Sequence, residues 1–307
     1  MIRSILAPAR DDASERRLGF ACAFAVLFIW TGFILASRAG AKGSLTSWDM
    51  AALRFGVSFA ALLPVALRGA LRGVPLGRIL ALAATAGYGF ALLAYAAFEL
   101  APAAHGAVLL PGALPFVTSL LALLFLGEPI SRARGASLAL IAAGIVLLAG
   151  WGFLEAPGAW RGDILFFLAT SSWAVFTILV RRWGVSALQA TTSIALGCAP
   201  LYLPLWWFAL PSSIALASWG EIVFQGVYQG LLAMALASLI YTRALVALGP
   251  VRLSLFTSLV PAMAALAAWP MLDEPLGPGS LAGVALVTAG MILGVRGGRV
   301  EPLLPRP

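Results

Sequence analysis

The chain has 307 residues, of which 62% are apolar and only 10% are charged, and its net charge is +8. Soluble domains carry about 25% charged residues, so this chain has too few charges to cover a water-facing surface, and its solvent must be lipid. The positive charge then indicates arginines at the ends of membrane spans, and we expect no nucleic-acid partner. The two cysteines, Cys22 and Cys198, lie in apolar runs and predict neither a disulfide framework nor a metal site.

Ten apolar runs are long enough to cross a bilayer, which takes about 20 residues for a helix. In chain order they cover residues 18–37, 47–67, 79–98, 104–126, 134–154, 162–180, 188–210, 221–243, 251–270 and 279–297. Backbone groups in lipid must pair within their own segment, so each run is predicted to be a helix. The first run could pass for a signal peptide, but a later segment repeats it, which favours a membrane span.

The arginines predict the orientation in the membrane. If the N-terminus is cytoplasmic, sixteen Lys and Arg residues fall on the cytoplasmic side, and three, Arg38, Lys42 and Arg161, fall on the external side. Positive residues concentrate on the cytoplasmic side of membrane proteins. We therefore expect residues 1–17 and 298–307 to be cytoplasmic tails.

The second half of the chain repeats the first. At an offset of 146 positions, Tyr95 corresponds to Tyr241, Pro115 to Pro261, and Glu128-Pro129 to Glu274-Pro275. Nearer the start of each half, "WTGF" at 30–33 corresponds to "WAVF" at 173–176. These matches predict two copies of a five-helix unit, residues 18–154 and 162–297. Because five is odd, the second copy is inverted in the membrane. Such inverted repeats are typical of alternating-access transporters, whose substrate sites lie near the midplane.

The spans, the inverted repeats, and the "GEP" at 127–129 and "DEP" at 273–275 after the fourth helix of each copy resemble the drug/metabolite transporter superfamily. The chain is most similar to the EamA-type exporters, over residues 18–297. The resemblance implies an all-α integral membrane protein of the bacterial cytoplasmic membrane that exports a small molecule. The bacterial amino-acid exporters, including the aromatic amino-acid exporter, are the members that we place nearest.

Trp30 and Trp173 lie deep inside their predicted spans and occupy equivalent positions in the two copies, whereas the other tryptophans fall near span ends. Both could simply fill space in the bundle. Alternatively, at least one lines a central cavity, where its ring can stack on a substrate or bind an ammonium group. In the resembled exporters a tryptophan on the sixth helix faces the cavity, which favours Trp173.

Several polar side chains inside the spans need partners. Tyr88 is mid-span between two glycines, so its hydroxyl should face protein or water, either in an interhelical hydrogen bond or on the substrate. The same alternatives hold for Tyr95, Tyr228 and Tyr241. Gln229 shares a helix face with Gln225, and the two amides require a neighbouring helix or a wet cavity.

The ninth span carries Ser254 and Ser258 ahead of Pro261, and Pro261 corresponds to Pro115 in the fourth span. A proline within a helix frees a carbonyl one turn earlier and bends the helix. The two bends could hinge a gate, or they could be structural, with the serine hydroxyls satisfying the freed carbonyls.

Few ionisable groups lie inside the spans. Arg54 is about 10 Å into the second span, and we expect it to extend toward the surface or to pair with Asp49. His105 lies near the external end of the fourth span and is either solvated or a proton-coupling group. No carboxylate lies at the centre of a predicted span, so the common intramembrane proton relay is missing.

These features predict a secondary transporter for small neutral or zwitterionic metabolites, with aromatic or apolar amino acids as the favoured substrates. The alternatives are an exporter of another metabolite or drug, such as a nucleoside or purine, and a channel-like facilitator. An enzyme is disfavoured, because the sequence has no HExxH or GxSxG motif, no clustered acids and a single histidine. We expect no cofactor and no metal, and a monomer, with a homodimer as the alternative.

Overall fold

The computed structural model describes residues 12–126 and 130–297, and these form helices joined by loops. The predicted tails therefore lie largely outside the described residues, as do Glu128 and Pro129. In the first half, two long helices, α2 (Asp12–Lys42) and α3 (Ser47–Leu67), come first. The third span consists of α4 (Leu76–Leu82), η1 (Ala83–Gly89) and α5 (Phe90–Leu100). The fourth consists of α6 (Ala103–Ala107), η2 (Val108–Gly112) and α7 (Leu114–Leu126), and the fifth is α8 (Arg132–Glu155).

The second half repeats this order. It starts with α9 (Trp160–Trp183) and α10 (Ala187–Ala209), and a short turn of helix, η3 (Ile214–Leu216), follows in the next loop. The eighth span consists of α11 (Trp219–Gln225), η4 (Gly226–Leu236) and α12 (Ala237–Leu248). The ninth consists of α13 (Pro250–Thr257) and α14 (Val260–Leu272), and the tenth is α15 (Pro278–Gly297). Within the described residues, nine spans are long and apolar enough to cross a membrane, and α8, with 24 residues, completes the ten. The predicted fold class is therefore confirmed.

The second helix of each half begins in the same way and contains a proline at an equivalent position. Thr46 and Ser186 each cap their helix and form a reciprocal capping box with the residue three positions later, Asp49 and Gln189 respectively. Pro64 and Pro204 lie inside the two helices. Both pairs are separated by 140 positions (186 − 46 and 204 − 64), which gives the offset between the copies for this helix.

Departures from α-helix are duplicated as well. The third and eighth spans pass through π-helical turns at η1 and η4, and η1 shifted by 146 positions falls within η4. The fourth and ninth spans break at Ala113 and at Ser258–Leu259. Pro115 and Pro261 follow these breaks as the second residues of α7 and α14, a position in the first turn where a missing N–H has little effect. The Ser258 hydroxyl donates to the Leu255 carbonyl at 2.8 Å, so it satisfies a backbone group beside the break.

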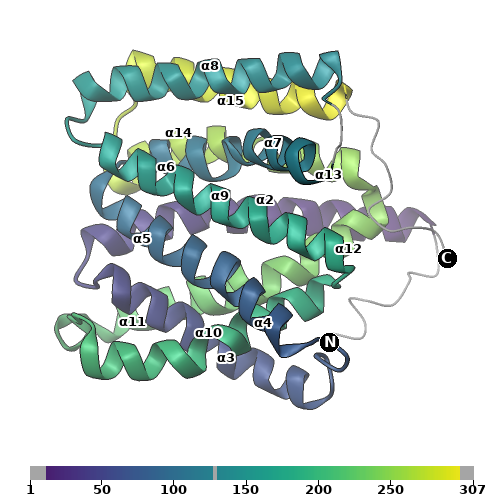
Figure 1. Cartoon of the computed structure of the whole chain (residues 1–307). Coiled ribbons are helices and arrows are strands. Elements are labelled where there is room, and N and C mark those ends of the chain that lie inside the picture. Colours follow the sequence, from purple (N-terminus) through teal and green to yellow (C-terminus); the bar gives the residue numbers. More distant parts are fainter. Residues whose placement is uncertain (1–11, 127–129, 298–307) are drawn as a thin grey trace.

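The helices pack with the same symmetry. The pairs α3–α10 and α8–α15 each join equivalent helices of the two halves. The contacts of α2 with α12 and α14 correspond to those of α9 with α5 and α7. Figure 1 shows α8 and α15 side by side as a separate layer at one edge of the bundle. Gly144 and Gly283 let their backbones touch, because a Cβ on Gly144 would lie 2.8 Å from the Gly283 carbonyl oxygen.

We call the end of the bundle at which α2 begins the near end, and the opposite end, at which α2 finishes, the far end (Figure 1). At the far end, Glu274 of the "DEP" motif accepts from Arg38 Nε at 2.6 Å and from the Ala103 backbone N–H at 2.8 Å. Lys42 Nζ lies 3.5 Å from the same carboxylate. These contacts fasten α2 to α6 and to the segment after α14 at the far end.

Asp49 forms a second far-end anchor. Its buried carboxylate accepts from Trp206 Nε1 at 2.9 Å and from the Ser213 backbone N–H at 3.0 Å. The Ser212 hydroxyl also donates to it. Asp49 therefore ties the start of α3 to the loop that follows α10, and its oxygens are occupied.

Candidate substrate site

Five polar side chains from both halves meet inside the bundle, and we call them the central cluster: Ser37, Arg54, Tyr95, Gln225 and Gln229. Each of them is at most 3% exposed. Arg54 and Gln229 lie seven and ten residues from the far-end starts of α3 and α11, which corresponds to about 10–15 Å. Ser37 and Tyr95 lie five residues from the far-end termini of α2 and α5, which corresponds to about 8 Å. The cluster therefore lies inside the far-end half of a bilayer about 30 Å thick, and its deepest members approach the midplane.

Hydrogen bonds connect four members of the central cluster. The Tyr95 hydroxyl donates to Gln229 Oε1 at 3.1 Å. Gln229 Nε2 is 3.2 Å from both Ser37 Oγ and Gln225 Oε1, and Gln225 Nε2 donates to the Ala36 carbonyl at 2.8 Å. The two amides on one helix face thus find partners on α2 and α5, as their positions required.

Arg54, the fifth member, behaves differently from the sequence-based expectation. It is 3% exposed and does not extend to the surface, and the Asp49 carboxylate is occupied by other donors. Its guanidinium lies close to the Tyr95 hydroxyl and 5.6 Å from the centre of the Phe33 ring. Arg54 Nε and Nη1 are buried and have no hydrogen-bond partner. The offset of 140 places Ile194 at the equivalent position of the second half, so only one copy carries this charge.

Aromatic rings lead from the central cluster to Trp173, and we call Phe33, Phe90 and Trp173 the aromatic ladder. The ring centres of Phe33 and Phe90 are 6.0 Å apart, and those of Phe90 and Trp173 are 4.8 Å apart. Phe33 also lies 6.5 Å from the Tyr95 ring. Trp173 is partly buried and contacts Phe176 on its own helix as well. The ladder joins the predicted tryptophan to the cluster.

Other predicted residues form contacts outside the cluster. The Tyr88 hydroxyl donates to the Cys198 carbonyl at 2.8 Å, which is the interhelical hydrogen bond that the sequence left open. Trp30 stacks on Tyr241 with ring centres 5.5 Å apart, and the Tyr228 hydroxyl donates to the Ile29 carbonyl at 3.3 Å. Ser254 and Ser258 lie on α13 and in the adjoining turn. The structure therefore brings Tyr95, Gln229 and Trp173 into one region, and the other predicted residues make separate contacts.

His105 is not the solvated residue that its sequence position suggested. It is 2% exposed, and its Nδ1 lies 2.7 Å from Asp163 Oδ1. Asp163 is in the first turn of α9, so this contact ties α6 to the sixth span near the far end. His105 and Asp163 are 58 positions apart, so their contact could not be predicted from spacing along the chain.

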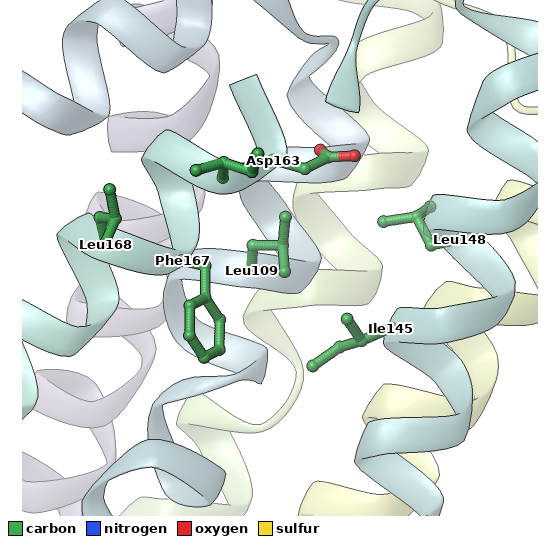
Figure 2. Close-up of a pocket in the computed structure, with 7 residues that line it drawn as sticks. Leu109, Ile145, Leu148, Asp163, Phe167 and Leu168 are labelled. Carbon is green, nitrogen blue, oxygen red and sulfur yellow. The ribbon is translucent and has the colours of Figure 1, made fainter. Parts of the chain in front are cut away.

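A cavity of about 260 Å³ lies between α8, η2 and α9. Figure 2 shows Leu148 and Ile145 on one side of it, Leu109 and Phe167 opposite, and Asp163 at its margin. Ile164, Phe167 and Leu168 are exposed on the outer surface of α9. The cavity is thus an apolar groove on the side of the bundle, and it is separate from the central cluster.

The fold consists of two five-helix repeats of membrane-spanning helices. A model of the EamA-like transporter family matches residues 17–150 and 160–296. The protein belongs to this family, whose members are transporters of the drug/metabolite type. One similar solved structure, described only as the crystal structure of a protein, is 20% identical with a TM-score of 0.62, over 92% of this chain and 96% of that chain. At this identity the likeness concerns the fold alone. Among curated proteins, the sequence comparison found no match.

Sequence reasoning did not select four residues of the candidate site: Arg54, Phe33, Phe90 and Ser37. A charge within a membrane span was the signal for Arg54, because such residues are costly and usually functional. Phe33 and Phe90 gave no comparable signal, since the chain has 17 phenylalanines.

Proposed function

We propose that the protein is a secondary transporter for small neutral or zwitterionic metabolites, and that aromatic and apolar amino acids are its substrates. The observation that carries this proposal is the central cluster beside the aromatic ladder, at the place where the two inverted repeats meet. Alternating-access transporters with inverted repeats bind substrates near the midplane at such an interface. The cluster offers polar contacts for a backbone-like head group, and the ladder offers aromatic faces for an apolar side chain.

The orientation follows from the arginines. The near end and the adjoining spans carry Arg16, Arg17, Arg68, Arg72, Arg78, Arg132, Arg134, Arg181, Arg182 and Arg252. The far end has Arg38, Lys42 and Arg161, two of which are paired with Glu274. By the positive-inside rule the near end faces the cytoplasm, in a bacterial inner membrane, and the resemblance to EamA-type exporters favours outward transport.

Uptake into liposomes tests the proposal. The purified protein is reconstituted, and the initial rates of uptake of radiolabelled phenylalanine, tryptophan, leucine and uridine are measured against protein-free liposomes. We expect saturable uptake of the amino acids, driven by their own gradients without a pH gradient. Uptake of uridine alone would favour a nucleoside transporter. Rates that rise linearly without saturation would indicate a channel-like facilitator. A requirement for a pH gradient that disappears in His105→Ala would assign proton coupling to His105.

A further inference from the structure

We propose that Arg54 binds a carboxylate group of the transported molecule. This inference rests on the proposed transport function and names the chemical group that the site recognises. The guanidinium of Arg54 is buried inside the bundle, and two of its nitrogens lack hydrogen-bond partners.

The unpaired nitrogens of Arg54 require a hydrogen-bond acceptor. Arginine stays protonated in proteins, and Nε and Nη1 together carry three N–H donors. In the part of the chain that the structure describes, no carboxylate forms an ion pair with Arg54. A buried charge without a counter-charge is strongly unfavourable, so we infer that the acceptor for the unpaired nitrogens comes from a bound molecule. A carboxylate matches the guanidinium in shape and offers about four acceptor positions.

The surroundings select a monocarboxylate with an apolar remainder. Arg54 brings one positive charge, and the other members of the central cluster are neutral. A carboxylate balances that charge, whereas a phosphate ester with two negative charges would leave one uncompensated. The Phe33 ring faces the guanidinium at 5.6 Å, and Phe90 and Trp173 continue the aromatic surface from there. A ring attached to the carboxylate by a short chain can therefore lie along the ladder.

Arg54 lies where α3 contacts the π-helical segment η4, a position from which a movement of η4 could open or close the site. Its backbone carbonyl lies at the contact of α3 with Gly230 of η4, where a Cβ on the glycine would be 3.1 Å from the oxygen. Gln229, the neighbour of Gly230, belongs to the cluster, and the segment is π-helical. Such π-helical turns occur frequently at functional sites. A shift of this turn would thus change the access to Arg54 and to its ligand together.

Ligand binding to the protein in detergent tests the proposal without requiring transport. The thermal unfolding midpoint is measured with phenylalanine, 3-phenylpropionate, which lacks the ammonium group, and phenethylamine, which lacks the carboxylate. We expect the first two to raise the midpoint of the wild type and phenethylamine to leave it unchanged. Stabilisation by phenethylamine equal to that by phenylalanine would overturn the proposal. So would equal stabilisation by sodium chloride at the same concentration, which would indicate a site for an inorganic anion.

Substitutions at Arg54 test whether this residue binds the carboxylate. Arg54→Gln should weaken phenylalanine binding at least tenfold, which corresponds to about 1.4 kcal/mol, and Arg54→Lys should retain part of it. Arg78→Gln is the matched control, because Arg78 also faces an aromatic ring, that of Trp183 at 5.4 Å, but is half-exposed at the near end. Unchanged binding in Arg54→Gln would overturn the proposal, and if this variant does not fold, the ligand series on the wild type decides. If carboxylates bind but no amino acid is transported, the carboxylate site stands and the proposed function is wrong.

Discussion

At the residue scale, Arg54 and Asp49 lie five residues apart on α3, and the expected pair between them does not form. Five residues correspond to about 140° around a helix with 3.6 residues per turn, so the two side chains leave α3 in different directions. Asp49 instead serves the capping box and the loop after α10. The partners of Tyr95 and His105 come from other helices, and spacing along the chain carries no information about them.

Trp173 provides a test of the aromatic ladder. Replacing it by alanine removes the ring that contacts Phe90, and aromatic contacts of this kind contribute about 0.5–1.5 kcal/mol beyond their buried area. We therefore expect Trp173→Ala to lower the apparent affinity for tryptophan severalfold in liposome uptake, and Trp173→Phe to lower it less. Trp207→Ala is the control, because Trp207 is 70% exposed. Equal uptake by Trp173→Ala and Trp207→Ala at matched incorporation would show that Trp173 only fills space.

At the scale of the elements, hydropathy was sufficient to find all ten spans, because each must supply about 20 apolar residues. It could not place η1, η4 or the breaks before Pro115 and Pro261. A π-helical turn changes the hydrogen-bond register of the backbone, and apolar composition does not record that register. The prolines did mark the correct spans, although the helix ends before each of them rather than bending around it.

The α8–α15 pair allows a test of element packing. Gly144→Ala would place a methyl group 2.8 Å from the Gly283 carbonyl oxygen and 2.9 Å from the Val287 backbone nitrogen. Backbone cannot move aside as a side chain can, so we expect a loss of about 1–3 kcal/mol, typical of overpacking, and a lower unfolding midpoint in detergent. Gly135→Ala, on the same helix, meets nothing within 4 Å and should raise the midpoint slightly, because alanine favours helix. A Gly144→Ala variant as stable as Gly135→Ala would contradict the close packing.

At the scale of the whole molecule, the duplication was readable because a few residues kept their spacing. Tyr95 and Tyr241, 146 positions apart, predicted the two copies correctly. The side chains of these two tyrosines nevertheless make different contacts. Tyr95 bonds Gln229 in the central cluster, whereas Tyr241 stacks on Trp30. The copies share a backbone plan, and their side chains have diverged: Arg54 of the first copy has Ile194 as its counterpart in the second.

Cysteine labelling tests the orientation of the molecule in the membrane. Leu216 is 82% exposed in the loop between α10 and α11 at the far end, and Arg72 is exposed in the loop between α3 and α4 at the near end. In intact cells, an impermeant maleimide should label Leu216→Cys and not Arg72→Cys, with both labelled after permeabilisation. The native Cys22 and Cys198 are buried, so the background should be low. The opposite pattern would reverse the proposed orientation.

Arg54 has no counterpart in the second copy, and in the proposed site its charge would make the empty carrier sensitive to the membrane potential. In the proposed alternating-access cycle, Arg54 would be connected electrically to one aqueous compartment and then to the other. Moving one charge across the whole field changes its energy by about 2.3 kcal/mol per 100 mV, so a negative interior holds the unloaded site open toward the cytoplasm. A zwitterion leaves the charge of the site unchanged, and a complete cycle then moves no net charge. A simple monocarboxylate neutralises Arg54, so its transport carries current. The membrane potential would therefore affect the transport of these two kinds of substrate differently.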